Sequence, residues 1–129
     1  MNLEKFSKPV LRMGLSLVLL WFGFQQITSP ENWAGFIPQF IISMGIAAKT
    51  MVIGNAIFEL TLGLFLITGL YTRFASALLG IHILGITISM GMTPTGIRDF
   101  GLFVASLVIF LNGPDKYCLD KKFEKNSYK

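Results

Sequence analysis

The sequence predicts an all-α integral membrane protein, a bundle of four transmembrane helices. Of its 129 residues, 53% are hydrophobic and only 14% are charged, and the mean hydropathy is +0.63. A chain of this length cannot bury so many apolar side chains inside a soluble fold. Four long apolar runs divide the chain, so we expect residues 1–129 to form a single transmembrane domain covered by lipid.

The four apolar runs define the predicted membrane spans. They cover residues 10–27, 51–70, 74–92 and 96–111. The first three approach the length of about 20 residues that crosses a bilayer core of about 30 Å. The fourth is uninterrupted only from Phe100 to Leu111, about 18 Å of helix. Crossing the bilayer therefore requires Arg98 and Asp99 to lie near or inside its boundary, as a pair shielded by protein.

The connection between the first two spans, residues 28–49, is too long for a tight turn and too apolar for a solvated loop. Ser29, Pro30 and Glu31 form a helix start signal. Apolar residues then recur at helical spacing: Trp33, Phe36, Ile37, Phe40, Ile41 and Met44. We expect an amphipathic segment that lies on the membrane surface or re-enters the bundle, with a break or bend at Pro38.

Positive charge is distributed unequally between the two ends of the predicted bundle. Most of the 11 lysine and arginine residues lie on the side of the termini: Lys5, Lys8, Arg12, Arg73, Lys116, Lys121, Lys122, Lys125 and Lys129. Only Lys49 and Arg98 lie on the other side. The positive-inside rule then predicts a multi-pass protein of the cell membrane with both termini in the cytoplasm. The tail, residues 115–129, has alternating charges and no apolar face, and we expect it to be solvated.

Composition excludes several classes of function. The basic residues do not form the single stripe that nucleic-acid binding requires, so no nucleic-acid partner is predicted. Cys118 is the only cysteine, which excludes an internal disulfide and a CxxC redox pair. Because His82 is also the only histidine, the sequence predicts no metal site.

Polar side chains inside the spans are the candidate functional residues, because each is costly in hydrocarbon and requires a partner or a purpose. We predict catalytic roles for Glu59 and His82, and ligand contacts for Gln25, Gln26, Asn55, Arg98 and Asp99. Asn55 and Glu59 are four residues apart on one helix face. Counted from Met51, Glu59 lies about 12 Å into the membrane, and His82 reaches a similar depth from the opposite end of its span. A meeting of the two, below a polar funnel that faces outward, is therefore geometrically possible.

Most of these residues also have a structural interpretation. Arg98 and Asp99 fit a boundary ion pair, or a helix N-terminal carboxylate stabilised by the helix dipole. Asn55 equally fits a hydrogen bond that joins two helices. His82 alone is more typical of a hydrogen-bonded core histidine than of a redox or metal ligand. Glu59 is the exception, because an ionisable residue within a span is a functional candidate by default.

Several motifs together resemble the DoxX family of small four-helix membrane proteins. The first span contains Leu11-Arg12-Met13-Gly14 and Trp21-Phe22-Gly23, followed by the connection with Trp33. The next motifs are Phe58-Glu59-Leu60-Thr61-Leu62-Gly63-Leu64 and Gly69-Leu70-Tyr71-Thr72-Arg73. The last are Arg98-Asp99-Phe100-Gly101-Leu102, Gly113-Pro114 and Tyr117-Cys118-Leu119-Asp120. The resemblance covers nearly the whole chain.

The resemblance implies a role associated with redox chemistry. Similar proteins form the membrane part of a thiosulfate:quinone oxidoreductase, and others are linked to oxidative-stress assemblies. By this resemblance Glu59, Arg98 and Asp99 occupy the family's polar motif positions, with Asn55 and His82 as neighbours. The chain departs from the pattern at Gln25 and Gln26, where a basic residue is common.

Two hypotheses of function follow. In the first, the protein is a subunit that binds a quinone-like or other small hydrophobic molecule in an outward-facing polar pocket, with electrons supplied by a substrate or by a soluble or membrane redox partner. In the second, it is a non-catalytic anchor or assembly partner for a soluble enzyme, or a binder of a lipid-like ligand. The sequence identifies neither the cofactor, for which a quinone is the candidate, nor whether the protein is an enzyme. A homo-oligomer is compatible with both hypotheses.

Overall fold

A computed structural model describes residues 2–128, and within this range the chain is helical and contains no strand. The elements are α1 (Glu4–Thr28), η1 (Pro30–Asn32), η2 (Ala34–Phe36), α2 (Gln39–Ser43), α3 (Ala48–Thr68), α4 (Thr72–Met90), α5 (Pro94–Asn112) and α6 (Leu119–Ser127). Four of them, α1, α3, α4 and α5, are long and apolar enough to cross a membrane. The predicted fold class, a four-helix membrane bundle, is confirmed.

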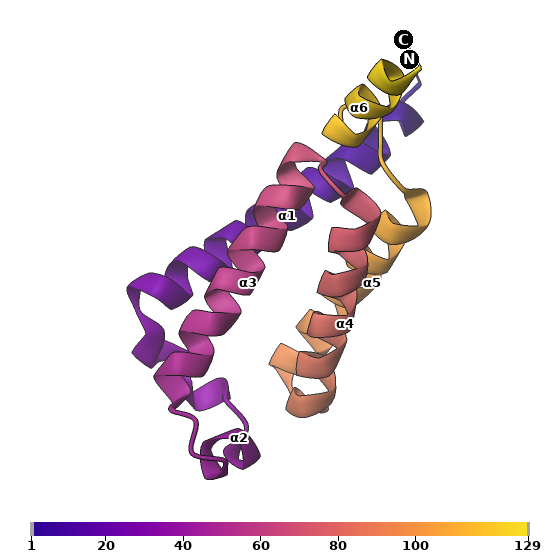
Figure 1. Ribbon diagram of the computed structural model, residues 1–129. Coiled ribbons are helices and arrows are strands. Elements are labelled where there is room, and N and C mark those ends of the chain that lie inside the picture. Colours follow the sequence, from indigo (N-terminus) through magenta and orange to yellow (C-terminus); the bar gives the residue numbers. More distant parts are fainter. Residues whose placement is uncertain (1, 129) are drawn as a thin grey trace.

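The long helices form two pairs rather than a symmetric bundle. α1 packs along α3 and α4 along α5, whereas contacts between the two pairs are fewer. In Figure 1 the pairs meet at the end that carries both termini and diverge toward the end that carries α2. We call these the terminal end and the α2 end. The divergence leaves room between the pairs at the α2 end.

Glycines allow α1 and α3 to approach closely. A Cβ atom added at Gly23 of α1 would lie 2.6 Å from Cγ of Leu60 on α3, closer than real Cβ contacts. A Cβ atom added at Gly63 of α3 would lie 3.0 Å from Cδ2 of Leu20 on α1. Each glycine therefore accepts a leucine of the facing helix, as small residues do where membrane helices pack together.

The apolar core lies between the two pairs, toward the terminal end. It consists of Leu15, Leu19, Leu62, Leu66, Ala75, Leu79, Ile83 and Ile109, so every long helix contributes to it. Many large apolar side chains remain on the outside; Ile81 and Ile88 of α4, for example, are more than 70% exposed. Such a surface is stable only in contact with lipid, as the composition predicts.

The fourth span begins earlier than its apolar run. Thr93 caps α5 by accepting a hydrogen bond from the Gly96 amide at 3.1 Å, and Pro94 occupies the first turn. α5 therefore has 19 residues, about 28 Å of helix. Arg98 and Asp99 lie in the second turn of this helix, which is long and apolar enough to cross a membrane.

The connection between α1 and α3 is not a regular amphipathic helix. The segment with helical spacing is divided into two short 3₁₀ turns and the five-residue α2. The expected break at Pro38 is confirmed: Ile37 and Pro38 are extended, because the proline ring disfavours helical backbone in the preceding residue. Gly45, with φ of +86°, prevents α2 from continuing into α3.

The prediction of a solvated tail from residue 115 is wrong for its first part. Asp115 and Cys118 are buried, and the tail packs against the turn between α3 and α4. Gly69 in this turn has φ of +76°, and a Cβ atom there would lie 2.5 Å from Cα of Cys118. Only glycine fits both this backbone conformation and this contact. The prediction failed because it relied on the missing apolar face, whereas polar contacts hold this segment.

Those polar contacts join the tail to three helices. Arg12 of α1 donates from Nε to Oδ2 of Asp115 at 2.7 Å, and from Nη1 to the carbonyl oxygens of Leu66 and Ile67 at the end of α3. Asp120 accepts hydrogen bonds from the Tyr71 and Thr72 amides at 2.7 and 2.8 Å, which caps the start of α4 from a distant part of the chain. We call Arg12, Asp115, Cys118 and Asp120 the terminal junction.

Two groups of the terminal junction have shifted acid–base equilibria. Burial alone would raise the pKa of Asp115, but hydrogen bonds from Arg12 and from the Tyr117 amide outweigh it and hold the pKa below its ordinary value of 3.8. Burial raises the pKa of the Cys118 thiol, despite hydrogen bonds to its sulfur from Thr72 and from the Asp115 amide. Asp115 is therefore ionised and Cys118 protonated at neutral pH.

Candidate functional site

A cavity of about 720 Å³ occupies the space between the two helix pairs at the α2 end. All four long helices and the connection between α1 and α3 contribute to its lining. Phe22, Trp33 and Phe36 form an aromatic wall, with ring centroids 5.5 Å apart for Phe22 and Trp33 and 5.9 Å apart for Trp33 and Phe36. Its volume and its largely apolar lining are typical of a small-molecule site.

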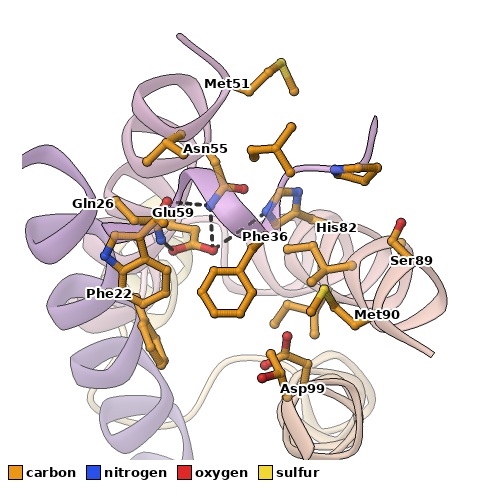
Figure 2. Close-up of a pocket in the computed structure, with 18 of the residues that line it drawn as sticks. Phe22, Gln26, Phe36, Met51, Asn55, Glu59, His82, Ser89, Met90 and Asp99 are labelled. Atoms are coloured by element: carbon orange, nitrogen blue, oxygen red, sulfur yellow. Dashed lines mark hydrogen bonds and ion pairs between the residues drawn. The ribbon is translucent and has the colours of Figure 1, made fainter. Parts of the chain in front are cut away.

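Glu59 is the centre of a hydrogen-bonded cluster on one wall of this cavity (Figure 2). Its carboxylate accepts hydrogen bonds from Gln26 Nε2 at 3.0 Å and from Asn55 Nδ2 at 3.1 Å. Asn55 also donates to Gln26 Oε1 at 2.8 Å, so the three side chains form a closed triangle between α1 and α3. Two amide donors satisfy the carboxylate where it is shielded from water.

His82 of α4 approaches the same carboxylate from the other helix pair. Its Nε2 atom lies 3.8 Å from Glu59 Oε1, so the meeting that helical rise allows is observed. This separation is too long for a hydrogen bond. His82 Nε2 is buried and has no hydrogen-bond partner among the described residues. The imidazole ring packs on Phe58, with centroids 4.8 Å apart, which fixes its position beside Glu59. We call Gln26, Asn55, Glu59 and His82 the cavity cluster.

Arg98 and Asp99 line the cavity on α5, apart from the cavity cluster. Arg98 donates two hydrogen bonds to Asp99 Oδ1, at 3.1 and 3.0 Å, and its guanidinium lies 5.1 Å from the ring centroid of Phe22. In Figure 2 the Asp99 carboxylate lies on a different wall from Glu59. The expected shielding holds for Asp99, whose side chain is 10% exposed, and is wrong for Arg98, at 51%. Adjacent side chains of a helix point about 100° apart, so Arg98 is not buried on the same face as Asp99.

The remaining predicted residue and the residues that prediction missed also line the cavity. Gln25 is half-buried there, and its side chain makes no hydrogen bond to the described residues. Prediction from polar residues overlooked the aromatic wall. Phe22 precedes Gln26 by four residues, so helical spacing alone would have placed both on one face of α1. Trp33 and Phe36 recur at helical spacing, in a segment expected to lie on the membrane surface or to re-enter the bundle. That spacing did not place them beside Phe22, because the segment is irregular.

The arrangement allows proton exchange and hydrogen bonding in an apolar enclosure. A carboxylate and an imidazole in close approach can pass a proton between them or to a bound molecule. The unpartnered His82 Nε2 can make one further hydrogen bond toward the cavity. Within residues 2–128, no three His, Cys, Asp or Glu side chains lie close enough together to hold a metal ion.

Comparison with known proteins agrees with this architecture. The model of the DoxX family matches residues 8–92, a range that includes most of α1, all of α3 and α4, and all four members of the cavity cluster. Searches among curated proteins and among solved structures found no match. Since the matched range is well over half of the chain, and the four long apolar helices identify a multi-pass membrane protein, the chain belongs to the DoxX family.

Proposed function

We propose that this protein binds a quinone-like molecule, or another small hydrophobic molecule with a ring and a polar oxygen, in the cavity between its helix pairs. The observation that carries the proposal is the unpartnered Nε2 of His82, buried beside Glu59 in a cavity with an aromatic wall. A flat ring fits against Phe22, Trp33 and Phe36. Its carbonyl oxygen supplies the acceptor that His82 lacks.

The cavity cluster then supplies protons for a redox reaction. Reduction of a quinone to a quinol consumes two electrons and two protons. Protonated His82 donates one proton to the nearer carbonyl oxygen and is reprotonated by the carboxylic acid of Glu59, whose Oε1 lies 3.8 Å from His82 Nε2. Water that enters the cavity supplies the second proton to the other oxygen and restores the acid. Gln26 and Asn55 hold the Glu59 carboxylate toward His82. The electrons come from a separate soluble or membrane redox partner.

Binding can be tested with the protein's own tryptophans. The chain has two, of which Trp33 lines the cavity and Trp21 is 56% exposed on the outside. In the Trp21→Phe variant, a short-chain ubiquinone analogue should quench Trp33 fluorescence with saturation. The His82→Leu variant should raise the concentration needed about tenfold, the effect of one lost hydrogen bond in an apolar site. Unsaturable quenching, identical in both proteins, would exclude a quinone site here.

Turnover separates the redox subunit from a non-catalytic binder of the same molecule. Membranes that contain the protein and its native electron donors should reduce the analogue, as followed by ultraviolet absorbance. Glu59→Gln should retain quenching and lose most of the reduction, because the amide cannot deliver a proton. If the analogue quenches Trp33 with saturation but the protein does not increase its reduction, the protein is a non-catalytic binder of this molecule.

We also propose that both termini face the cytoplasm, as the excess of basic residues at the terminal end indicates. Alkaline phosphatase and green fluorescent protein report opposite sides of the membrane when fused to the C-terminus. Fluorescence without phosphatase activity is expected. Phosphatase activity without fluorescence would show that the C-terminus faces the other side of the membrane, with the cavity toward the cytoplasm.

A further inference from the structure

The second part of the tail, α6, presents a concentrated positive charge at the terminal end. Four lysines gather around one shallow depression on its surface: Lys116, Lys121, Lys122 and Lys125. Only Lys121 has an ion-pair partner among the described residues, Glu124 at 3.2 Å. We call these four lysines the basic face.

Two of the three acids of the tail do not neutralise this charge, because they point inward; only Glu124 pairs with a lysine of the basic face. Asp115 is paired with the buried Arg12, and Asp120 caps the first amides of α4. Most of the alternating charges are thus separated in space, with the Asp115 and Asp120 carboxylates holding the bundle and the ammonium groups facing outward. This separation makes the basic face a candidate for binding anions.

The position of α6 indicates the source of those anions. α1 has 25 residues, about 37 Å of helix, which exceeds the bilayer core of about 30 Å. Its first turns therefore extend to the level of the lipid headgroups, and Figure 1 shows α6 at the same end of the bundle. The Lys116 ammonium lies 5.8 Å from the ring centroid of Phe6 in α1, which places the basic face at the same level.

Exposed aromatic side chains lie among the lysines. Phe6, Tyr117 and Phe123 are 40%, 52% and 55% exposed. Lys116 lies over the Tyr117 ring at 4.8 Å and Lys5 over the Phe6 ring at 5.0 Å. Aromatic rings mixed with lysines are typical of the membrane–water interface, where rings enter the headgroup layer and ammonium groups meet phosphates. An acidic protein surface would match the lysines but would leave these rings unexplained.

We propose that α6 and the basic face form an interfacial site for anionic phospholipid headgroups, which holds the tail against the bilayer. This proposal does not depend on any ligand in the cavity. Each of the three lysines without an ion-pair partner should raise the equilibrium constant for binding of α6 to an anionic bilayer about fivefold. The attraction should weaken at high salt, because part of it is screened.

Hydrogen–deuterium exchange of the full-length protein in nanodiscs tests the proposal. The amides of α6 should exchange about tenfold or more slowly in an equal mixture of phosphatidylglycerol and phosphatidylcholine than in phosphatidylcholine alone. The triple variant Lys116→Gln, Lys122→Gln, Lys125→Gln should lose this difference, and the corresponding arginine variant should keep it. Lys49→Gln, which removes one charge at the α2 end, is a further control.

The contrary outcomes are equally specific. Equal exchange of α6 in both lipids would overturn the proposal and leave an acidic protein as the partner of the basic face. Slowed exchange in phosphatidylcholine after addition of inorganic phosphate alone would identify a free-anion site instead, and would also contradict it. Unchanged exchange of α3 in every variant would show that the bundle remains folded.

Discussion

The terminal junction and the cavity cluster are two buried polar groups at opposite halves of the bundle, and their hydrogen bonding differs. At the terminal junction, Arg12 directs its donors to a carboxylate and to two helix-end carbonyls, and Asp120 receives two backbone amides. In the cavity cluster, the triangle around Glu59 is closed but His82 Nε2 remains without a partner.

This difference indicates what each group is for. Buried polar atoms are nearly always paired, so a fully paired cluster is explained by the stability that it gives the fold. An unpaired buried nitrogen beside a carboxylate, in a cavity, instead requires a ligand to complete it. We therefore expect substitutions at the terminal junction to affect stability, and substitutions in the cavity cluster to affect binding and turnover.

The largest effect on stability is expected for Arg12→Met. The methionine keeps the length of the side chain but leaves the buried Asp115 unpaired, at a cost of about 3–5 kcal/mol. Cys118, the only cysteine and fully buried, allows a direct measurement, since a fluorogenic thiol dye reacts with it only after unfolding. Lys8→Ala removes an exposed charge on the same helix, and its free energy of unfolding should lie within about 0.5 kcal/mol of that of the wild type. Equal melting of both variants would show that this pair contributes little.

Acid should weaken the terminal junction through Asp115. Its pKa is lowered in the folded protein, so its contribution to stability is complete above the ordinary value of 3.8 and is lost as the pH falls through the lower folded value. Wild type should melt at a constant temperature down to about pH 4 by this mechanism and then lose stability. Asp115→Asn should be less stable at neutral pH and should decline less below pH 4. Parallel curves for the two proteins would contradict this assignment.

A smaller loss is expected for Asp120→Ala. The substitution removes the acceptor for two amides at the start of α4, and loss of such a cap costs about 1–2 kcal/mol. Glu124→Ala is the matched control, because its carboxylate pairs only with the exposed Lys121. Thermal melting of both variants gives the comparison. A cost for Asp120→Ala no larger than that of the control would mean that water replaces the cap.

The comparison also explains what could be predicted from the sequence. The four spans follow from apolar length, and the meeting of Glu59 with His82 follows from counting helical rise from opposite ends. Both depend on regular geometry. The terminal junction does not depend on regular geometry. Arg12 and Asp115, for example, are 103 residues apart along the chain, and no periodic pattern connects them.

Irregular backbone limited prediction at the cavity as well. Trp33 lies between two 3₁₀ turns and Phe36 ends the second, and in such a segment helical spacing no longer indicates which side chains share a face. Arg98 and Asp99 were expected to be shielded together because the span was judged by its apolar run, whereas a Thr93 cap and Pro94 start α5 before that run and only Asp99 is buried. In both places, local turn and cap chemistry determined positions that hydropathy cannot specify.

The smallest effect on stability, and the sharpest contrast with Arg12→Met, is expected for Glu59→Gln. The glutamine has a single amide oxygen, so it can replace only one of the two carboxylate oxygens that accept hydrogen bonds from Gln26 and from Asn55. One hydrogen bond is lost, so the stability should fall by about 1 kcal/mol or less. Thermal melting with the thiol dye measures this directly, with Glu124→Gln as the exposed control. Reduction of the quinone analogue should nevertheless be lost, because proton delivery to His82 requires the acid. A stability loss comparable to that of Arg12→Met would show that the cavity cluster, like the terminal junction, exists to hold the helices together.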